Sequence, residues 1–361
     1  MPATKVTYDG STKMFQQMDI SPSDSTGLDS IAFVANRGLP WWKEIGSKDA
    51  GQFGVTELEE LQTAEAMLEH ASLGWRVLQS PATYLDADNV LRTADRQIVN
   101  YRSDTGAFLG LVSPVYKIVQ NAEAFSWSDS LVDSGDAKYE TAGALFGGRR
   151  VVVSMEVSSV KGIRVKGEKE EGEVRTYLVT VNAHDGSMPL ISMVTPVRWV
   201  CKNTLNLALG KHRGIYRIRH TGTVEGKLEA AREALGVTFE YMADFKAMAD
   251  SLAKQKVVDK QVKEIVDKLW PKTPLQVELG REGTADRAFA AYHASETLEG
   301  IRGTKWGVLQ AVAEFVDHEL PRRQGKAVRV WDAADTRTQG ILMGQQVEVK
   351  QRALELLTAK S

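Results

Sequence analysis

The feature that most constrains the fold is a predicted β-hairpin between residues 177 and 194. Its first strand, Tyr177 to Val181, is apolar and rich in β-branched residues, and its second, Pro189 to Val194, is apolar again. Between them the sequence NAHDGS (residues 182–187) contains an Asp-Gly pair, which favours a tight turn with positive φ angles. This pattern predicts a hairpin around which the rest of the chain is organised.

A helix is predicted directly after the hairpin. Thr195 and Pro196 have the pattern of a helix start, a hydroxyl N-cap followed by proline at the first helical position, where its missing N–H costs nothing. Apolar residues recur at helical spacing over residues 197–208, and Gly210 can end the helix. The opposite face of this helix would carry Arg198, Lys202 and Asn206.

The charge around this segment is unevenly distributed. No Asp or Glu occurs from Gly186 to Val224, although the whole chain has a net charge of −2. Such a local excess of cations indicates a surface suited to phosphate or another polyanion. The alternative is a solvated surface whose cations pair with acids from elsewhere in the chain. The six cations of this stretch are Arg198, Lys202, Lys211, Arg213, Arg217 and Arg219.

A second candidate for anion binding is the sequence GGRR at residues 147–150. Gly147 and Gly148 place a flexible turn directly before Arg149 and Arg150, which suits a backbone that approaches a phosphate with two guanidinium groups beside it. An ordinary surface turn is the alternative. The spacing matches neither a phosphate-binding P-loop nor a dinucleotide-binding fingerprint.

Several of these motifs resemble the phage/plasmid-like family known as domain of unknown function 932. The resemblance covers about Trp41 to Leu357 and implies a mobile genetic element as the context, but it supplies no catalytic motif. The matching segments are WW (41–42), YKIVQNAEA (116–124), GGRR (147–150), HDGSMPLISMVTPVRWVCKNTLNLAL (184–209), IRHTGT (218–223) and GTKWGVLQAVAEFVDH (303–318).

Length and composition place the chain among globular proteins. Its 361 residues suffice for one large or two ordinary domains, and 43% hydrophobic with 25% charged residues is typical of a soluble protein. The single cysteine, Cys201, excludes an internal disulfide framework and fits a reducing compartment. No apolar run is long enough to span a bilayer, and the N-terminus lacks a secretion signal, so we expect a cytoplasmic protein.

The predicted fold class is α+β: an antiparallel β-meander and hairpin sheet packed with helices, followed by a helical C-terminal region. Residues 1–38 are expected to form a polar N-terminal arm, 39–224 the α+β core domain and 225–361 the mainly helical region. Strands are predicted over 75–119 as a meander, 139–145 and 151–157. Helices are predicted over 56–71, 121–135, 225–269 with an interruption near Gly236, 284–297, 305–320 and 345–359.

A search for a catalytic group in the sequence finds none. Cys201 with His184 and Asp185 could imitate a thiol nucleophile with its base, but Cys201 falls on the apolar face of the predicted helix, where a buried, inert thiol is expected. His212 and His220 have arginine neighbours that disfavour a bound metal, and the residues Asp317-His318-Glu319 are expected on a helix surface. We therefore expect neither cofactor nor metal.

From the sequence we expect a nucleic-acid-binding protein that binds or anneals single-stranded DNA and forms a homo-oligomer. The order of its elements is analogous, at the level of the fold, to phage single-strand annealing proteins. One alternative is an oligomeric protein-interaction factor or host-system inhibitor without nucleic-acid binding, and another is a metal-dependent nuclease. The predicted binding residues are Arg149, Arg150, Arg198, Lys202, Lys211, Arg213, Arg217 and Arg219, with Trp199 and Tyr216, and with Trp41 or Trp42 as further stacking candidates.

Overall fold

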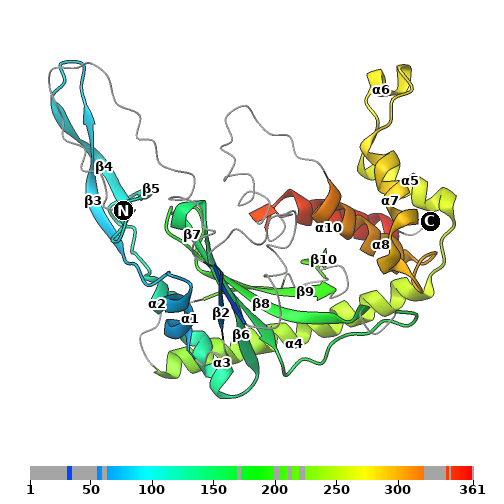
Figure 1. Ribbon diagram of the computed structural model, residues 1–361, viewed down its shortest axis with the longest axis horizontal. Helices are drawn as coiled ribbons and strands as arrows, with labels where there is room; N and C mark the ends of the chain where they lie inside the picture. The colour runs from blue at the N-terminus through cyan, green and yellow to red at the C-terminus, as the bar shows by residue number, and fades with distance from the viewer. Residues whose placement is uncertain are drawn as a thin grey trace.

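The predicted hairpin lies inside the larger of two β-sheets in the computed structural model (Figure 1). β8 (Val174–Ala183) pairs antiparallel with β9 (Ile191–Arg198), and their connection, residues 184–190, begins with the HDGS part of the NAHDGS sequence. The strand order of this main sheet is β10-β9-β8-β7-β6-β1-β2, with β11 also paired to β9. Its other strands are β1 (Ile31–Val34), β2 (Val55–Leu58), β6 (Ala137–Leu145), β7 (Arg150–Val157), β10 (Asn203–Thr204) and β11 (Ile215–Arg217).

The structure describes residues 31–34, 55–58, 63–168, 172–198, 203–209, 214–218, 224–320, 339–340 and 343–359.

The segment expected as a polar N-terminal arm contributes a strand to the main sheet. β1 pairs antiparallel with β6 and parallel with β2. Thr56, expected at the start of a helix, lies in β2 instead. The helix of this region, α1 (Ala64–His70), begins later because Thr63 is its N-cap, with a side-chain oxygen that accepts from the Ala66 N–H at 3.2 Å.

The helix predicted from Thr195 and Pro196 is wrong, because both residues belong to β9. All eight residues of β9 are buried, and pairing with β8 on one side stabilises the extended backbone more than the local cap pattern stabilises a helix. Residues 205–208 are not helical either. The Leu207 N–H donates to the Tyr241 hydroxyl at 3.0 Å, which attaches this segment to a helix of the C-terminal region.

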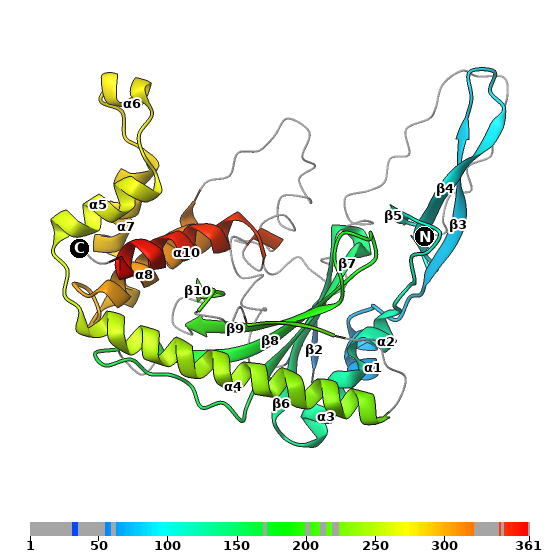
Figure 2. The same cartoon turned by 180° about the vertical axis from the view of Figure 1, so that it is seen from behind.

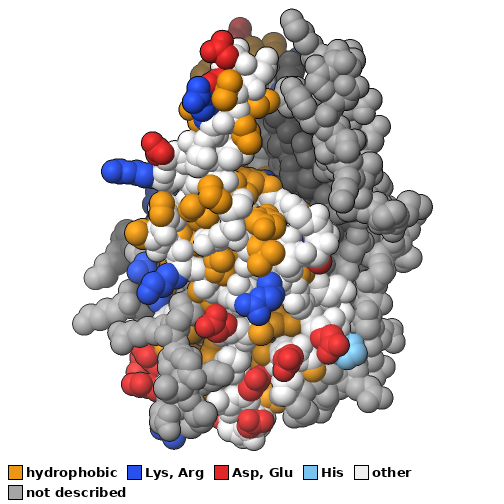
Figure 3. Space-filling model, turned by 90° about the vertical axis from the view of Figure 1, so that its left-hand side faces the viewer, with side chains coloured by type: hydrophobic (Ala, Val, Ile, Leu, Met, Phe, Trp, Pro, Cys, Tyr) orange, Lys and Arg blue, Asp and Glu red, His pale blue; other side chains and the backbone are white. Residues whose placement is uncertain are grey.

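The meander predicted over 75–119 is confirmed as a separate, smaller sheet. β3 (Val77–Leu85), β4 (Leu91–Arg102) and β5 (Phe108–Val112) pair in that order, all antiparallel. β3 and β4 continue beyond β5 as a two-stranded ribbon that projects from the body of the molecule (Figure 1). Seen from that end, the surface exposes hydrophobic side chains together with Lys, Arg, Asp and Glu (Figure 3).

A short helical segment links the two sheets, in agreement with the predicted helix over 121–135. It consists of α2 (Asn121–Phe125), η2 (Ser126–Ser128) and α3 (Asp129–Asp133). Gly135, with φ +75°, ends it as expected of a left-handed C-terminal glycine.

The C-terminal region is helical, as predicted, and its longest helix crosses one face of the main sheet (Figures 1 and 2). The interruption expected near Gly236 is wrong, because α4 runs unbroken past it and the break comes at residues 255–258. Buried side chains on both sides of the glycine, among them Ala234 and Tyr241, hold the helix against the core. The helices are α4 (Val224–Lys254), α5 (Asp259–Leu269), α6 (Pro274–Glu278), α7 (Thr284–Ala294), η5 (Glu296–Leu298), α8 (Lys305–Glu314), the π-helical turn η6 (Phe315–Glu319) and α10 (Gln345–Thr358).

One buried cluster joins the sheet and the C-terminal helices. It includes Val153 and Leu178 of the main sheet together with Phe245 of α4 and Trp306 of α8. A smaller cluster, with Val179 and seven other residues, lies on the opposite face of the sheet. Among the described residues, no helix combines the length and apolarity needed to cross a membrane.

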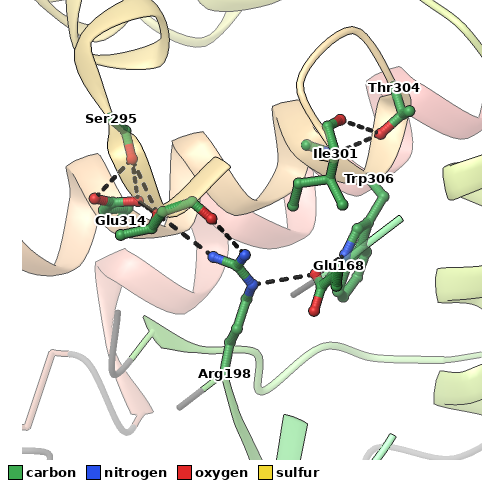
Figure 4. Close-up of polar contacts among 9 residues, drawn as sticks. Glu168, Arg198, Ser295, Ile301, Thr304, Trp306 and Glu314 are labelled. Atoms are coloured by element: carbon green, nitrogen blue, oxygen red, sulfur yellow. Dashed lines mark hydrogen bonds and ion pairs between the residues drawn. The ribbon is translucent and has the colours of Figure 1, made fainter. Parts of the chain in front are cut away.

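A buried ion pair connects the last residue of β9 to the C-terminal helices (Figure 4). Arg198 Nε donates to Glu168 Oε1 at 3.1 Å, and Arg198 Nη2 donates to the Thr297 carbonyl at 2.6 Å. The indole N–H of Trp306 donates to the same Glu168 oxygen at 2.5 Å. The side chains of Arg198 and Glu168 are 2% and 0% exposed. Burial raises the pKa of Glu168, while the Arg198 charge and the Trp306 hydrogen bond oppose that shift.

A second buried pair lies nearby and corrects the expectation that Asp317 is on a helix surface. Asp317 and Lys350 have fully buried side chains, and Lys350 Nζ lies 2.6 Å from Asp317 Oδ1. Lys350 Nζ also donates to the Thr204 hydroxyl at 2.7 Å, while the Thr204 N–H donates to Asp317 Oδ2 at 3.0 Å. This network joins β10, η6 and α10.

Replacing Arg198 should destabilise the fold strongly. Arg198→Ala leaves the Glu168 carboxylate buried without its countercharge, so we expect the free energy of unfolding to fall by about 3–5 kcal/mol in denaturant titrations. Arg352→Ala is the matched control, because the Arg352 side chain is 62% exposed on α10, and it should change stability by no more than about 0.5 kcal/mol.

A double variant separates the buried charge from the lost packing. Arg198→Met with Glu168→Gln removes both charges and should recover much of the stability that Arg198→Ala loses. A loss for Arg198→Ala as small as that of the Arg352 control would contradict the structural role of this pair.

Candidate nucleic-acid interface

The smaller sheet is positioned by close contact with the β8–β9 connection. Gly110 of β5 packs so tightly that a Cβ there would lie 2.7 Å from the Asp185 Cα, so only glycine fits. Beside it, Asn100 Nδ2 of β4 donates to the His184 carbonyl at 2.7 Å. The face of the smaller sheet that carries Asn100 and Gly110 is therefore its inner face, and it is fixed to one end of the main sheet.

The outer face of the smaller sheet is apolar and partly exposed: Leu78, Phe108 and Leu111 are exposed, and Tyr101 and Val99 are half-buried. Cross-strand pairing aligns Leu78, Tyr101 and Phe108 in one row and Val99 with Leu111 in the next. Phe108 is 48% exposed and Leu111 is 52% exposed. We call these five residues the outer face. It combines two adjacent aromatic rings with aliphatic neighbours, on the end of the molecule shown in Figure 3.

The GGRR sequence forms the predicted turn, and this turn packs against the base of the smaller sheet. Phe146, Gly147 and Gly148 all have positive φ, at 55°, 69° and 100°. A Cβ on Gly148 would lie 2.9 Å from Trp75 Cζ2, so glycine is needed for this approach. The turn carries Arg149 to the edge of the outer face.

Three arginines at this junction each lie over an aromatic ring. Such cation–π contacts keep a guanidinium close to an apolar surface while its charge stays available to an anion. The three pairs, with the distance from the guanidinium carbon to the ring centroid, are Arg102 with Trp75 (4.5 Å), Arg149 with Phe108 (5.7 Å) and Arg150 with Phe146 (5.4 Å).

Arg150 uses only part of its hydrogen-bonding capacity at this junction. Its Nη2 donates to the Ser187 hydroxyl at 3.2 Å and lies 3.7 Å from Asp185 Oδ2. Its Nε and Nη1 are buried and have no hydrogen-bond partner among the described residues. The Arg150 side chain is 12% exposed, and its two unpaired N–H donors are suited to donate to an oxyanion such as a phosphate.

Sheet register places Arg217 on the same side and at the same end as Arg150. Arg150 pairs with Ala183 on β8, Val181 pairs with Ile191 on β9, and Ile191 pairs with Arg217 on β11. Paired residues share a face, and so do residues two apart along a strand. The exposed Arg217 therefore extends the cationic end of the main sheet.

Two other predicted residues are placed elsewhere. Arg198 pairs with Val174, nine residues along β8 from the partner of Arg150, which puts the two arginines about 30 Å apart along the sheet. Arg198 is also buried in the ion pair described above, so it does not belong to this interface. Tyr216 packs on the main core, and its hydroxyl donates to Glu233 Oε2 of α4 at 3.1 Å.

The remaining predicted residues lie outside the described part of the chain: Trp199, Lys202, Lys211, Arg213 and Arg219, with Trp41, Trp42, Cys201, His212 and His220.

Sequence reasoning missed Trp75, Tyr101, Arg102 and Phe108. Arg102 does not lie in a stretch without acidic residues, because Asp104 follows it in the sequence. In the structure the two side chains pair at 2.6 Å. The aromatic residues belong to a meander that was recognised, but only strand register shows that Tyr101 and Phe108 are neighbours. A test of which meander positions share the exposed face could have found them.

His184 is a structural residue rather than a catalytic base. Its ring is fully buried and lies edge-on to Trp75, with centroids 5.4 Å apart. Its Nε2 is 2.8 Å from Asn121 Oδ1, and because that oxygen can only accept, the neutral ring carries its proton on Nε2. Burial lowers the pKa of His184 to about 4.

Within the residues that the structure describes, no group of three or more His, Cys, Asp or Glu side chains is arranged to hold a metal ion.

The chain belongs to the family described as domain of unknown function (DUF932), which it matches over residues 108–340, more than half of its length. Neither the curated proteins nor the solved structures contain a match. The matched segment includes β5, the GGRR turn and the main sheet from β6 onward, but not β3 and β4.

The buried His184 predicts how stability depends on pH. Its ordinary pKa of 6.5 applies to the unfolded chain and about 4 to the folded one, so between these values only the unfolded state binds the proton. The free energy of unfolding should therefore fall as pH drops below about 6.5, by about 2 kcal/mol at pH 5 relative to pH 7. Denaturant titrations of the parent and of His184→Gln at both pH values measure this difference, and an identical pH dependence in the two proteins would contradict it.

Proposed function

We propose that this protein binds single-stranded nucleic acid, with the outer face of the smaller sheet stacking against bases and Arg149 and Arg150 contacting the sugar-phosphate backbone. Arg217 extends the path of the backbone along the end of the main sheet. In the mobile-element context suggested by the sequence resemblance, we propose that such binding serves annealing or protection of single strands during recombination or replication.

The observation that carries this proposal is the aromatic pair Tyr101 and Phe108 on an exposed sheet face, with the Arg149 guanidinium over the Phe108 ring. Proteins that bind single strands combine stacking platforms with cations that follow the backbone. Each base offers a flat face to an aromatic ring whatever its identity, so such a platform binds with little sequence preference.

Arg150 supplies the phosphate contact that the aromatic pair lacks. Its Nε and Nη1 groups have no partner among the described residues and point in different directions, so each can donate to a separate phosphate oxygen. The Nη2 group between them contacts Ser187 and lies near Asp185.

A single strand suits this surface better than a duplex does. The outer face is broad and apolar, whereas bases in a duplex present only their edges in the grooves. Unstacked bases of a single strand expose apolar faces that Phe108 and Tyr101 can cover. The overall charge of −2 gives no general attraction to nucleic acid, so affinity depends on this local site.

Salt dependence of binding tests the role of the arginines. The parent should bind a fluorescently labelled single-stranded oligonucleotide at low salt and lose affinity steadily between about 50 and 200 mM salt. Each phosphate contact contributes about 0.7 to the slope of log K against log salt, so Arg149→Ala with Arg150→Gln should reduce that slope by about 1.4. Fluorescence anisotropy measures both quantities.

Two further variants belong in the same titration, one that tests base stacking and one that serves as a control. Phe108→Ala should weaken binding by about 1–3 kcal/mol while the salt slope stays unchanged, because stacking releases no counterions. Arg352→Ala on α10 should behave like the parent. The proposal is overturned if the parent does not bind at low salt, or if the double arginine variant keeps the parent's slope while its thermal unfolding is unchanged.

A further inference from the structure

The smaller sheet carries a further arginine on the same side as the outer face. Arg76 directly precedes β3, and its backbone continues the pairing with β4. The Ser103 N–H donates to the Arg76 carbonyl at 2.9 Å, and the Arg76 N–H donates to the Ser103 hydroxyl at 2.9 Å. Arg76 is thus one step beyond the pair of Val77 and Arg102. Because residues two apart along a strand share one side of the sheet, Arg76 lies on the same side as Leu78.

The charge of Arg76 is available to a ligand. Its side chain is exposed, and no described residue forms an ion pair with it. Asp104, in the turn between β4 and β5, is already paired, because Arg102 Nε and Nη2 donate to the two oxygens of its carboxylate at 3.0 and 2.6 Å. The guanidinium of Arg76 can therefore donate its N–H groups to a phosphate.

Arg76 and Arg149 lie at opposite ends of the row formed by Leu78, Tyr101 and Phe108. This row crosses the three strands of the smaller sheet. At its β5 end, the Arg149 guanidinium carbon lies 5.7 Å from the centroid of the Phe108 ring. At its β3 end, Arg76 adjoins Leu78. Neighbouring strands are about 4.8 Å apart, so about 10 Å separates the two ends of the row. The row therefore has an arginine at each end and an aromatic pair between them.

A ligand that crosses the strands meets both arginines, whereas one that runs along them does not. On β3 the same side of the sheet continues from Leu78 to Ser80, and on β4 it continues from Tyr101 to Val99, so a path over these residues contains no second cation. A single strand alternates flat bases with charged phosphates. Laid across the row, its phosphates can contact the two arginines while the bases between them stack on the aromatic rings.

We propose that Arg76 is a further phosphate-binding residue and that a bound single strand crosses the smaller sheet from β3 to β5. This inference rests on the proposed function and gives the bound strand a direction on the protein. The strand passes from Arg76 over the aromatic pair to Arg149 and Arg150. A strand that ran along β3 and β4 instead would leave either Arg76 or Arg149 without a phosphate.

Salt titrations of the full chain with the labelled single-stranded oligonucleotide test the Arg76 contact. Arg76→Gln removes one phosphate contact, so it should lower the slope of log K against log salt by about 0.7. Arg76→Lys keeps the charge and should keep the parent's slope. Combined with Arg149→Ala and Arg150→Gln, Arg76→Gln should bring the total reduction to about 2.1, because the three side chains contact different phosphates.

Arg281→Gln is the matched control for the loss of one exposed arginine. Arg281 is exposed and follows α6, at the opposite end of the molecule from the smaller sheet (Figures 1 and 2). This variant should bind like the parent, with the same slope.

Two carboxylate substitutions on β3 test the direction of the strand. Leu78→Glu places a negative charge inside the row, between Arg76 and Tyr101, whereas Ser80→Glu places the same charge on the same side of β3 but outside the row. If the strand crosses the sheet, Leu78→Glu should weaken binding more than Ser80→Glu does, because its carboxylate repels the phosphates. Equal losses for the two variants would contradict the crossing direction.

The outcomes separate this inference from the proposed function. If Arg76→Gln keeps the parent's slope while Arg149→Ala with Arg150→Gln lowers it, the Arg76 contact is overturned and the proposed function stands. An equal reduction of the slope by Arg281→Gln would show a general effect of charge and would also overturn the contact. A parent that does not bind at low salt overturns both. Unchanged thermal unfolding of each variant excludes misfolding as the cause.

Discussion

The antiparallel pairing of β7, β8 and β9 is the constraint on which the placement of the cations depends. It brings the start of β7, the end of β8 and the start of β9 to one end of the main sheet, where the smaller sheet is attached. Arg150 is fixed at this end and Arg198 at the other. Arg198 and Arg217, which belong to one acid-free stretch of sequence, are therefore separated in space, and Arg217 lies at the same end of the sheet as Arg150.

Burial then decides which charges remain available to a partner. Arg198 and Lys350 are enclosed with carboxylates and hold the sheet to the C-terminal helices. Breaking a buried pair of this kind strongly lowers the free energy of unfolding, so both cations have a structural role. Arg149, by contrast, lies exposed over Phe108 at the surface. Arg198 and Lys350 thus stabilise the fold, whereas Arg149 stays accessible for the proposed contact with nucleic acid.

Local patterns predicted the elements whose stability is local. The Asp-Gly turn, the meander and the later helices, such as α8 and α10, follow from turn chemistry and apolar periodicity. The predictions were wrong where tertiary contacts outweigh local preference. Thr195 and Pro196 have a helix-start pattern but are buried in a paired strand. Gly236 does not interrupt α4, because residues before and after it in the helix are packed against the core. Of the candidate site, the GGRR turn was predictable; its partner Phe108 required the register between β4 and β5.

Photo-crosslinking to a single-stranded oligonucleotide that contains halogenated uracil, followed by mass spectrometry of the digested complex, tests the location of the interface most directly. Stacked bases should crosslink to Tyr101 or Phe108, and adduct-bearing peptides should come from β4 and β5. Crosslinks confined to the C-terminal helices, or their absence from β4 and β5 under conditions in which the strand is bound, would contradict the account.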